Sequence, residues 1–149
     1  MPFFSKLRSS TPPDESLPRA VMTPAVSAIM ADGDMQAEEV SQLSNLCSFS
    51  PVFAHIHPER LAEIVRELIA ETMEKGGDTT LREAAARLSP RMSETAFCFV
   101  ARIVMADGTI TDQEEDALQK IAEILEVPAG TVAQIVDVVQ MMQRKPHED

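Results

Sequence analysis

Apolar residues recur at the spacing of an α-helix along most of the chain. They fall at i, i+3 and i+4 over about residues 58–75, again over about 111–126, and once more within 132–139. Between these segments, residues 95–105 are apolar on nearly every side apart from Arg102, which is expected of a helix at the centre of a fold. The pattern predicts helices packed on helices.

Capping residues and prolines predict where these helices begin and end. A hydroxyl side chain before a proline can cap a helix whose first position is that proline. Three pairs have this form: Thr23-Pro24, Ser50-Pro51 and Ser89-Pro90. Residues 80–83 and 111–114 have the spacing of a capping box, in which a hydroxyl and a carboxylate satisfy each other's backbone N–H groups. Gly76-Gly77 is typical of a helix end.

The segment before Thr23 has a different character. It is rich in Ser, Thr and Pro, and it contains the run Ser-Ser-Thr-Pro-Pro-Asp-Glu at 9–15. We therefore expect residues 1–22 to be a disordered or loosely docked arm, with the helical domain spanning 23–143.

Composition agrees with a helical fold and limits the partners. The chain has no Trp or Tyr and only 5 Gly among 149 residues, which is unfavourable for a β-rich domain. Its formal charge is −11, from 13 basic and 24 acidic residues. Such a surface repels nucleic-acid phosphates and attracts cations or basic proteins, so we expect no nucleic-acid partner and a basic or membrane-associated protein partner instead.

The cysteines and the lack of a long apolar run indicate a cytoplasmic protein. Cys47 and Cys98 lie in apolar helical stretches without CxxC spacing, and we expect buried free thiols in a reducing compartment. No apolar run approaches the ~18 residues of a membrane span. The first residues also lack the apolar core of a signal peptide.

The chain matches itself at an offset of 75 residues. Residues 30–39 (MADGDMQAEE) fall on 105–114 (MADGTITDQE), where Met, Ala, Asp, Gly and the final Glu coincide. Further on, 61–65 match 132–136 after a shorter loop in the second copy. We therefore expect a bundle of two pseudo-symmetric helical repeats, about 23–75 and about 90–143, joined by a linking helix over 78–88.

These two segments resemble the TerB-like domains of tellurite-resistance proteins. The resemblance rests on the Ala-Asp-Gly turn, the apolar residue two positions later, and the Glu four positions after that. It covers about residues 23–143 and implies an all-α, multihelical fold. Family members are associated with metal-ion stress, and the domain also occurs in a DnaJ-like, membrane-linked chaperone.

The resemblance implies a non-enzymatic accessory or scaffold protein of a tellurite or metal-ion stress response. The alternative is a plain protein–protein interaction module that regulates a membrane or chaperone complex and has no ion role. No Ser–His–Asp order, phosphate-cradling Gly loop or HExxH helix supports catalysis. We expect no enzyme activity.

The two Asp-Gly turns permit two interpretations. In the structural one, the carboxylates only cap the following helices. In the other, they hold a divalent cation weakly, because the motif matches the second half of an EF-hand loop. The first half is missing, since Ile103 and Met105 occupy ligand positions in the second copy, and this excludes a high-affinity calcium site. The candidate metal ligands are Asp32, Glu39, Asp107 and Glu114.

No other cofactor is predicted. His55 and His57 could face one side of an extended segment and bind a transition metal. Their position in a loop before Pro58 favours exposed histidines without a ligand.

Overall fold

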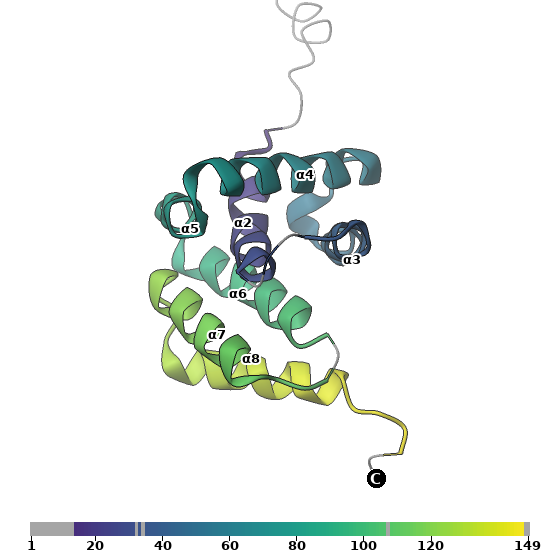
Figure 1. Cartoon of the computed structure of the whole chain (residues 1–149), viewed down its shortest axis with the longest axis vertical. Coiled ribbons are helices and arrows are strands. Elements are labelled where there is room, and N and C mark those ends of the chain that lie inside the picture. Colours follow the sequence, from purple (N-terminus) through teal and green to yellow (C-terminus); the bar gives the residue numbers. More distant parts are fainter. Residues whose placement is uncertain (1–13, 32, 34, 107, 148–149) are drawn as a thin grey trace, which may run out of the picture.

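The computed structural model describes residues 14–31, 33, 35–106 and 108–147, and these form an all-α fold as the sequence predicts. Seven α-helices and one 3-10 turn make up the described part, and no strand occurs in it (Figure 1). Their bounds are α2 Ser16–Met30, α3 Ala37–Ser48, η1 Pro51–Phe53, α4 Pro58–Lys75, α5 Gly77–Ala86, α6 Pro90–Val104, α7 Asp112–Ile124 and α8 Ala129–Met142.

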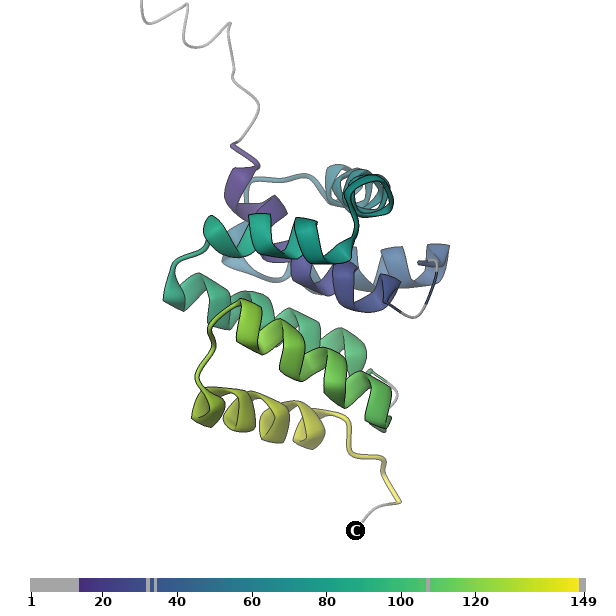
Figure 2. The same cartoon turned by 60° about the vertical axis from the view of Figure 1, so that its left-hand side comes forward.

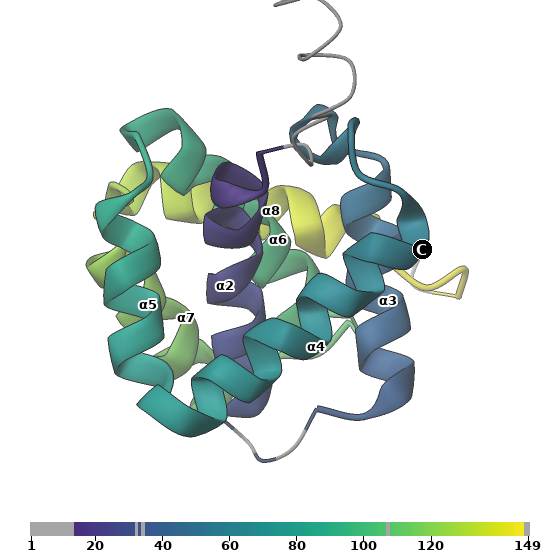
Figure 3. The same ribbon diagram turned by 90° about the horizontal axis from the view of Figure 1, so that it is seen from above.

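Helices α2 and α6 form the centre of the bundle. They contact each other more extensively than any other pair of described elements, and α2 also packs against α4 and α5. Figure 3 shows α2 between α5 and α3, with α4 crossing it. In Figure 2 the helices lie in layers, and α8 (yellow) is the outermost layer at one end.

Completely buried apolar side chains, small and large, lie on both helices of the α2–α6 pair. Val21, Met22 and Ala25 of α2 are completely buried, as are Phe97 and Val100 of α6. These positions recur at three- and four-residue intervals, so each helix places one continuous apolar face at the contact. Helix α6 is not enclosed on every side, however, because Cys98 is exposed.

The prediction of two buried cysteines is therefore half wrong. Both thiols are free, but only Cys47 is buried. Cys98 projects from the side of α6 that α2 does not cover, and the apolar sequence around it gave no indication of this. Burial raises the pKa of the Cys47 thiol to about 12, and the pKa of Cys98 is raised as well, first by desolvation and then by Glu94.

The arm expected over residues 1–22 is wrong from Ser16 onward, because residues 16–22 form the first half of α2. Pro18 and Met22 are buried there, and burial of this face offsets the turn-rich sequence. Arg60 of α4 also holds the start of the helix, since its Nη2 lies 2.8 Å from Oε1 of Glu15. Residues 1–13 lie outside the described residues.

The Thr23-Pro24 pair does not start a helix. Helix α2 continues through Pro24, because the side chains around it are buried against neighbouring helices. The Thr23 hydroxyl donates to the carbonyl of Arg19 at 2.7 Å instead of capping. The capping box expected at 80–83 is also wrong, since Thr80 lies inside α5 and its hydroxyl donates to the Gly77 carbonyl at 3.1 Å.

Other helix ends lie where the sequence places them. Helix α4 spans residues 58–75 as expected, and Gly76 ends it with φ +89°. The Ser89 hydroxyl caps α6 by accepting from the Met92 N–H at 3.1 Å. Ser50 caps the 3-10 turn η1 rather than an α-helix, accepting from the Val52 N–H at 3.3 Å.

The two Asp-Gly turns correspond locally. The Gly33 N–H donates to the Met30 carbonyl at 3.1 Å, and the Gly108 N–H donates to the Met105 carbonyl at 3.0 Å. Both glycines have positive φ, although the values of 132° and 83° are not equal. The following helices begin at Ala37 and Asp112, which are also 75 residues apart.

Beyond these turns the halves pack differently. Helix α3 packs chiefly on α4, whereas α7 and α8 each pack on α6. The pseudo-symmetry of the complete repeats therefore stays a prediction. None of the described helices is both long and apolar enough to cross a bilayer.

Candidate functional site

Glu39 and Glu114, two of the four predicted cation ligands, line the same cavity. This cavity, which we call the acidic hollow, has a volume of ≈ 430 Å³ and lies between the α2–α3 and α6–α7 segments. Each glutamate is the third residue of its helix, α3 or α7. The structure thus brings together two carboxylates from corresponding turns.

The wall of the acidic hollow is built from corresponding positions in the two halves. Four pairs of its lining residues are each separated by 75 positions. They are Ala28 and Ile103, Ile29 and Val104, Glu39 and Glu114, and Gln42 and Ala117. Of the described residues that line the hollow, none is Lys or Arg. The two carboxylates therefore share a wall whose described residues provide no basic side chain to balance them.

Both carboxylates also cap their own helices. Glu39 Oε1 accepts a hydrogen bond from the Gln36 N–H at 3.0 Å, and Glu114 Oε1 accepts one from the Thr111 N–H at 3.0 Å. The Thr111 hydroxyl accepts from the Glu114 N–H at 3.1 Å, which completes the predicted capping box. Capping occupies one oxygen of each carboxylate and leaves the other oxygen for a further partner.

The remaining two predicted ligands, Asp32 and Asp107, lie outside the described residues. Within the described ranges, no group of three or more His, Cys, Asp or Glu side chains could hold one metal ion. Two carboxylates with water as the other ligands suit a hard cation such as Mg²⁺, which retains several waters in protein sites. The described residues fit weak binding and not a closed, high-affinity site.

One of the two histidines caps a helix. His57 Nδ1 accepts a hydrogen bond from the Glu59 N–H at 3.3 Å, so this imidazole caps α4. His55 is exposed in the preceding loop. The sequence gave no signal for the capping role of His57, because histidine is not among the residues that usually cap a helix N-terminus.

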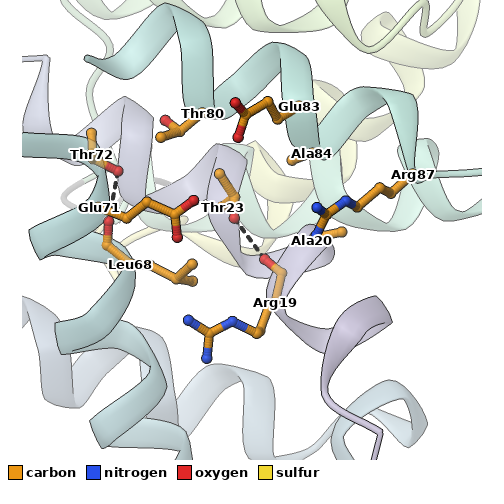
Figure 4. A pocket seen from close by; sticks show the side chains of 10 residues that line it. All are labelled: Arg19, Ala20, Thr23, Leu68, Glu71, Thr72, Thr80, Glu83, Ala84 and Arg87. Atoms are coloured by element: carbon orange, nitrogen blue, oxygen red, sulfur yellow. Dashed lines mark hydrogen bonds between the residues drawn. The ribbon is translucent and has the colours of Figure 1, made fainter. Parts of the chain in front are cut away.

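A second pocket lies between α2, α4 and α5 (Figure 4). Its volume is ≈ 40 Å³, which is room for a water molecule rather than a substrate. Three threonines line it, but their hydroxyls donate within their own helices; that of Thr72, for example, donates to the Leu68 carbonyl at 2.7 Å. The sequence gave no signal for this pocket, and its polar groups are explained by helix structure.

The main charge cluster lies beside this pocket and joins α2 to α4. Arg60 donates to both oxygens of Glu15, at 2.9 Å from Nε and 2.8 Å from Nη2. Its Nη1 also donates to Glu67 Oε2 at 2.6 Å. These hydrogen bonds hold the pKa of Glu15 and of Glu67 below the ordinary value, and the same bonds raise the pKa of Arg60.

The comparison with protein families agrees with this architecture. The family model described as "Tellurite resistance protein TerB" matches residues 18–137, which is most of the chain and includes both turns and both glutamates of the acidic hollow. No curated protein and no solved structure gave a match. The chain belongs to the TerB tellurite-resistance family.

Proposed function

We propose that this TerB-family protein is a non-enzymatic accessory or scaffold protein of a tellurite or metal-ion stress response, and that its acidic hollow binds a divalent cation weakly. One observation carries the cation proposal. Glu39 and Glu114 come from corresponding turns and line one hollow whose described wall residues include no Lys or Arg.

Electrostatics gives the physical reason for binding. Two carboxylates that line one hollow repel each other, because the described wall residues provide no basic side chain between them. A divalent cation between them would remove this repulsion. Affinity stays low because each carboxylate is already stabilised by a backbone N–H and by the positive end of its helix.

The non-enzymatic part of the proposal rests on side-chain chemistry. The sequence lacks the motifs of nucleophilic and metal-dependent hydrolases. The pKa values of both Cys47 and Cys98 are raised, which leaves less thiolate at neutral pH than an ordinary cysteine has. Free thiols also support the cytoplasmic location that we propose.

A second candidate function is a protein–protein interaction module that regulates a membrane or chaperone complex without an ion role. The exposed apolar face of α8 favours it, since Val138, Met141 and Met142 lie on the surface. The net charge of −11 favours a basic or membrane-associated protein as partner and disfavours nucleic acid.

Calorimetric titration with Ca²⁺, Mg²⁺ and Zn²⁺ tests the cation proposal. The variants are Glu39→Gln and Glu114→Gln, in which the amide oxygen can still cap the helix but a ligand charge is lost. Their matched controls are Glu38→Gln and Glu115→Gln, which remove the same charge one residue away, outside the described wall of the hollow. Adjacent helical positions point about 100° apart, so the controls leave the site intact.

We expect weak binding by wild type and by both controls, and reduced binding by both variants. A cation at ten times its Kd should stabilise the folded wild type by about 1.4 kcal/mol, because it binds only the folded state. Melting curves with and without the ion measure this gain. Equal ion dependence in all five proteins, or none in any, contradicts the cation site and leaves capping as the role of both glutamates.

A further inference from the structure

Helix α8 lies at the outside of the bundle, and several of its apolar side chains are exposed. Asp137 is its single charged residue over 129–142, and Val139 is its single fully buried one. Val138 and Met142 are 50% and 60% exposed. In Figure 2 α6 and α7 lie on one side of α8 and no described helix lies on the other, so no described helix covers these exposed apolar side chains.

The exposed face of α8 continues into a cavity, which we call the α6–α8 groove. Its volume is ≈ 400 Å³, and its wall consists largely of apolar side chains. They include Leu46 of α3, Phe99 of α6, and Ile135, Val138 and Met142 of α8. Methionine and aromatic side chains in one groove are typical of surfaces that receive an amphipathic helix.

A single charged side chain interrupts this wall. Arg102 is the only charged residue among the described residues that line the groove. Its Nε is buried and has no hydrogen-bond partner among the described residues. Because Arg102 is the one charged side chain among these lining residues, it places a positive charge beside an otherwise apolar groove, and an acidic side chain on an occupant would complement that charge.

We propose that the α6–α8 groove binds an amphipathic helix of another protein, with an apolar stripe against α8 and an acidic side chain opposite Arg102. The groove follows α8 from Gln134 to Met142, which is about 12 Å of helix and matches an i, i+4, i+7 stripe. This inference deepens the second candidate function above and is independent of the acidic hollow.

A second copy of this chain fits the groove less well. The groove-facing α8 residues Gln134, Ile135 and Val138 offer no carboxylate to a partner's Arg102. Two chains that each carry a charge of −11 also repel one another. A helix from a different protein avoids both difficulties.

The test uses fluorescence anisotropy with two labelled synthetic peptides. Both are amphipathic helices of about 18 residues with Leu at i, i+4 and i+7, and they differ at one position beside the central Leu, which is Glu in one and Lys in the other. Wild type should bind the Glu peptide at least about tenfold more tightly than the Lys peptide. Arg102→Glu should reverse this preference.

Two further variants separate the groove from general charge and from folding. Arg66→Glu makes the same charge change on α4, at an exposed position outside the groove, and it should keep the wild-type preference. Val138→Asp should weaken both peptides at least about tenfold, while circular dichroism shows unchanged helicity. Val138 is half exposed, so the fold should tolerate this change.

The proposal is overturned if wild type binds neither peptide at about millimolar concentration, or if it does not distinguish them. It is also overturned if wild type is a dimer in sedimentation and Val138→Asp makes it monomeric, because a second copy would then occupy the groove. Cation titrations of Arg102→Glu and Val138→Asp should match wild type. Loss of cation binding in Glu39→Gln with peptide binding retained would separate the two sites.

Discussion

Phe97 is the best position at which to test the central helix contact. It is 0% exposed on α6 and is among the largest completely buried side chains of the described part. Replacing it with Ala removes the ring and leaves a cavity that the surrounding helices can close only in part. Such substitutions cost about 3–5 kcal/mol, which is a large share of the roughly 5–15 kcal/mol that stabilises a typical domain.

The matching experiment is urea denaturation of Phe97→Ala and Phe49→Ala beside wild type. Phe49 undergoes the same chemical change but is 88% exposed after α3, so we expect its loss to stay within about 0.5 kcal/mol. For a chain of this size, the Phe97 variant should melt about 6–20 °C lower. Similar losses at the two positions would refute the placement of α6 at the centre of the bundle.

Two further predictions concern the backbone and the ion cluster. Gly76→Ala should destabilise the protein by about 1–3 kcal/mol, because φ is +89° there. Gly130→Ala should instead stabilise it by about 0.4–1 kcal/mol, because Gly130 lies in α8 and an added Cβ would meet no atom within 4 Å. Urea denaturation measures both changes, and a similar loss of stability at the two glycines contradicts the reasoning. The pKa values of Glu15 and Glu67 are lowered by Arg60, so the stability they contribute is present above their ordinary value of 4.5 and is lost as pH falls below it. Between about pH 5 and pH 3, Arg60→Met should therefore lose less stability than wild type, and parallel pH profiles would show that the cluster contributes nothing.

The sequence predicted elements well where local signals and tertiary packing agree. Helix α4 has an apolar stripe, Pro58 at its start and Gly76 after its end, and its bounds match the prediction. Thr111 and Glu114 form the expected capping box for the same reason. Each of these signals acts within a few residues, so the sequence contains nearly all the information required.

Predictions failed where burial prevails over a local signal. Thr23-Pro24 has the chemistry of a helix start, but the residues on either side are buried in the centre of the bundle, and the helix begins earlier. Thr80 has the spacing of a cap, but α5 already begins at Gly77, with Gly76 as its N-cap. Neither outcome can be derived from a short sequence window, because burial depends on helices that are distant in sequence.

The candidate sites also differ in how much of each the sequence predicts. The 75-residue offset shows that Glu39 and Glu114 occupy corresponding positions. Their place in one hollow depends on the packing of α2 against α6, which the offset does not predict. The α6–α8 groove had no sequence signal of its own. The apolar stripe within 132–139 packs against the core as its spacing predicts, and only the structure shows that Val138, Met141 and Met142 beside it are exposed.

Helices α4 and α8 differ in the charge of their corresponding surface positions. When the sequence match of 61–65 with 132–136 is continued along both helices, Glu67 falls on Val138 and Glu71 falls on Met142. On α4 these positions are charged, and Glu67 binds Arg60 and Arg19 at the surface. On α8 the corresponding positions are apolar and exposed. Exposed apolar patches mark interaction surfaces, so the charged face of α4 suits solvent and the apolar face of α8 suits a partner.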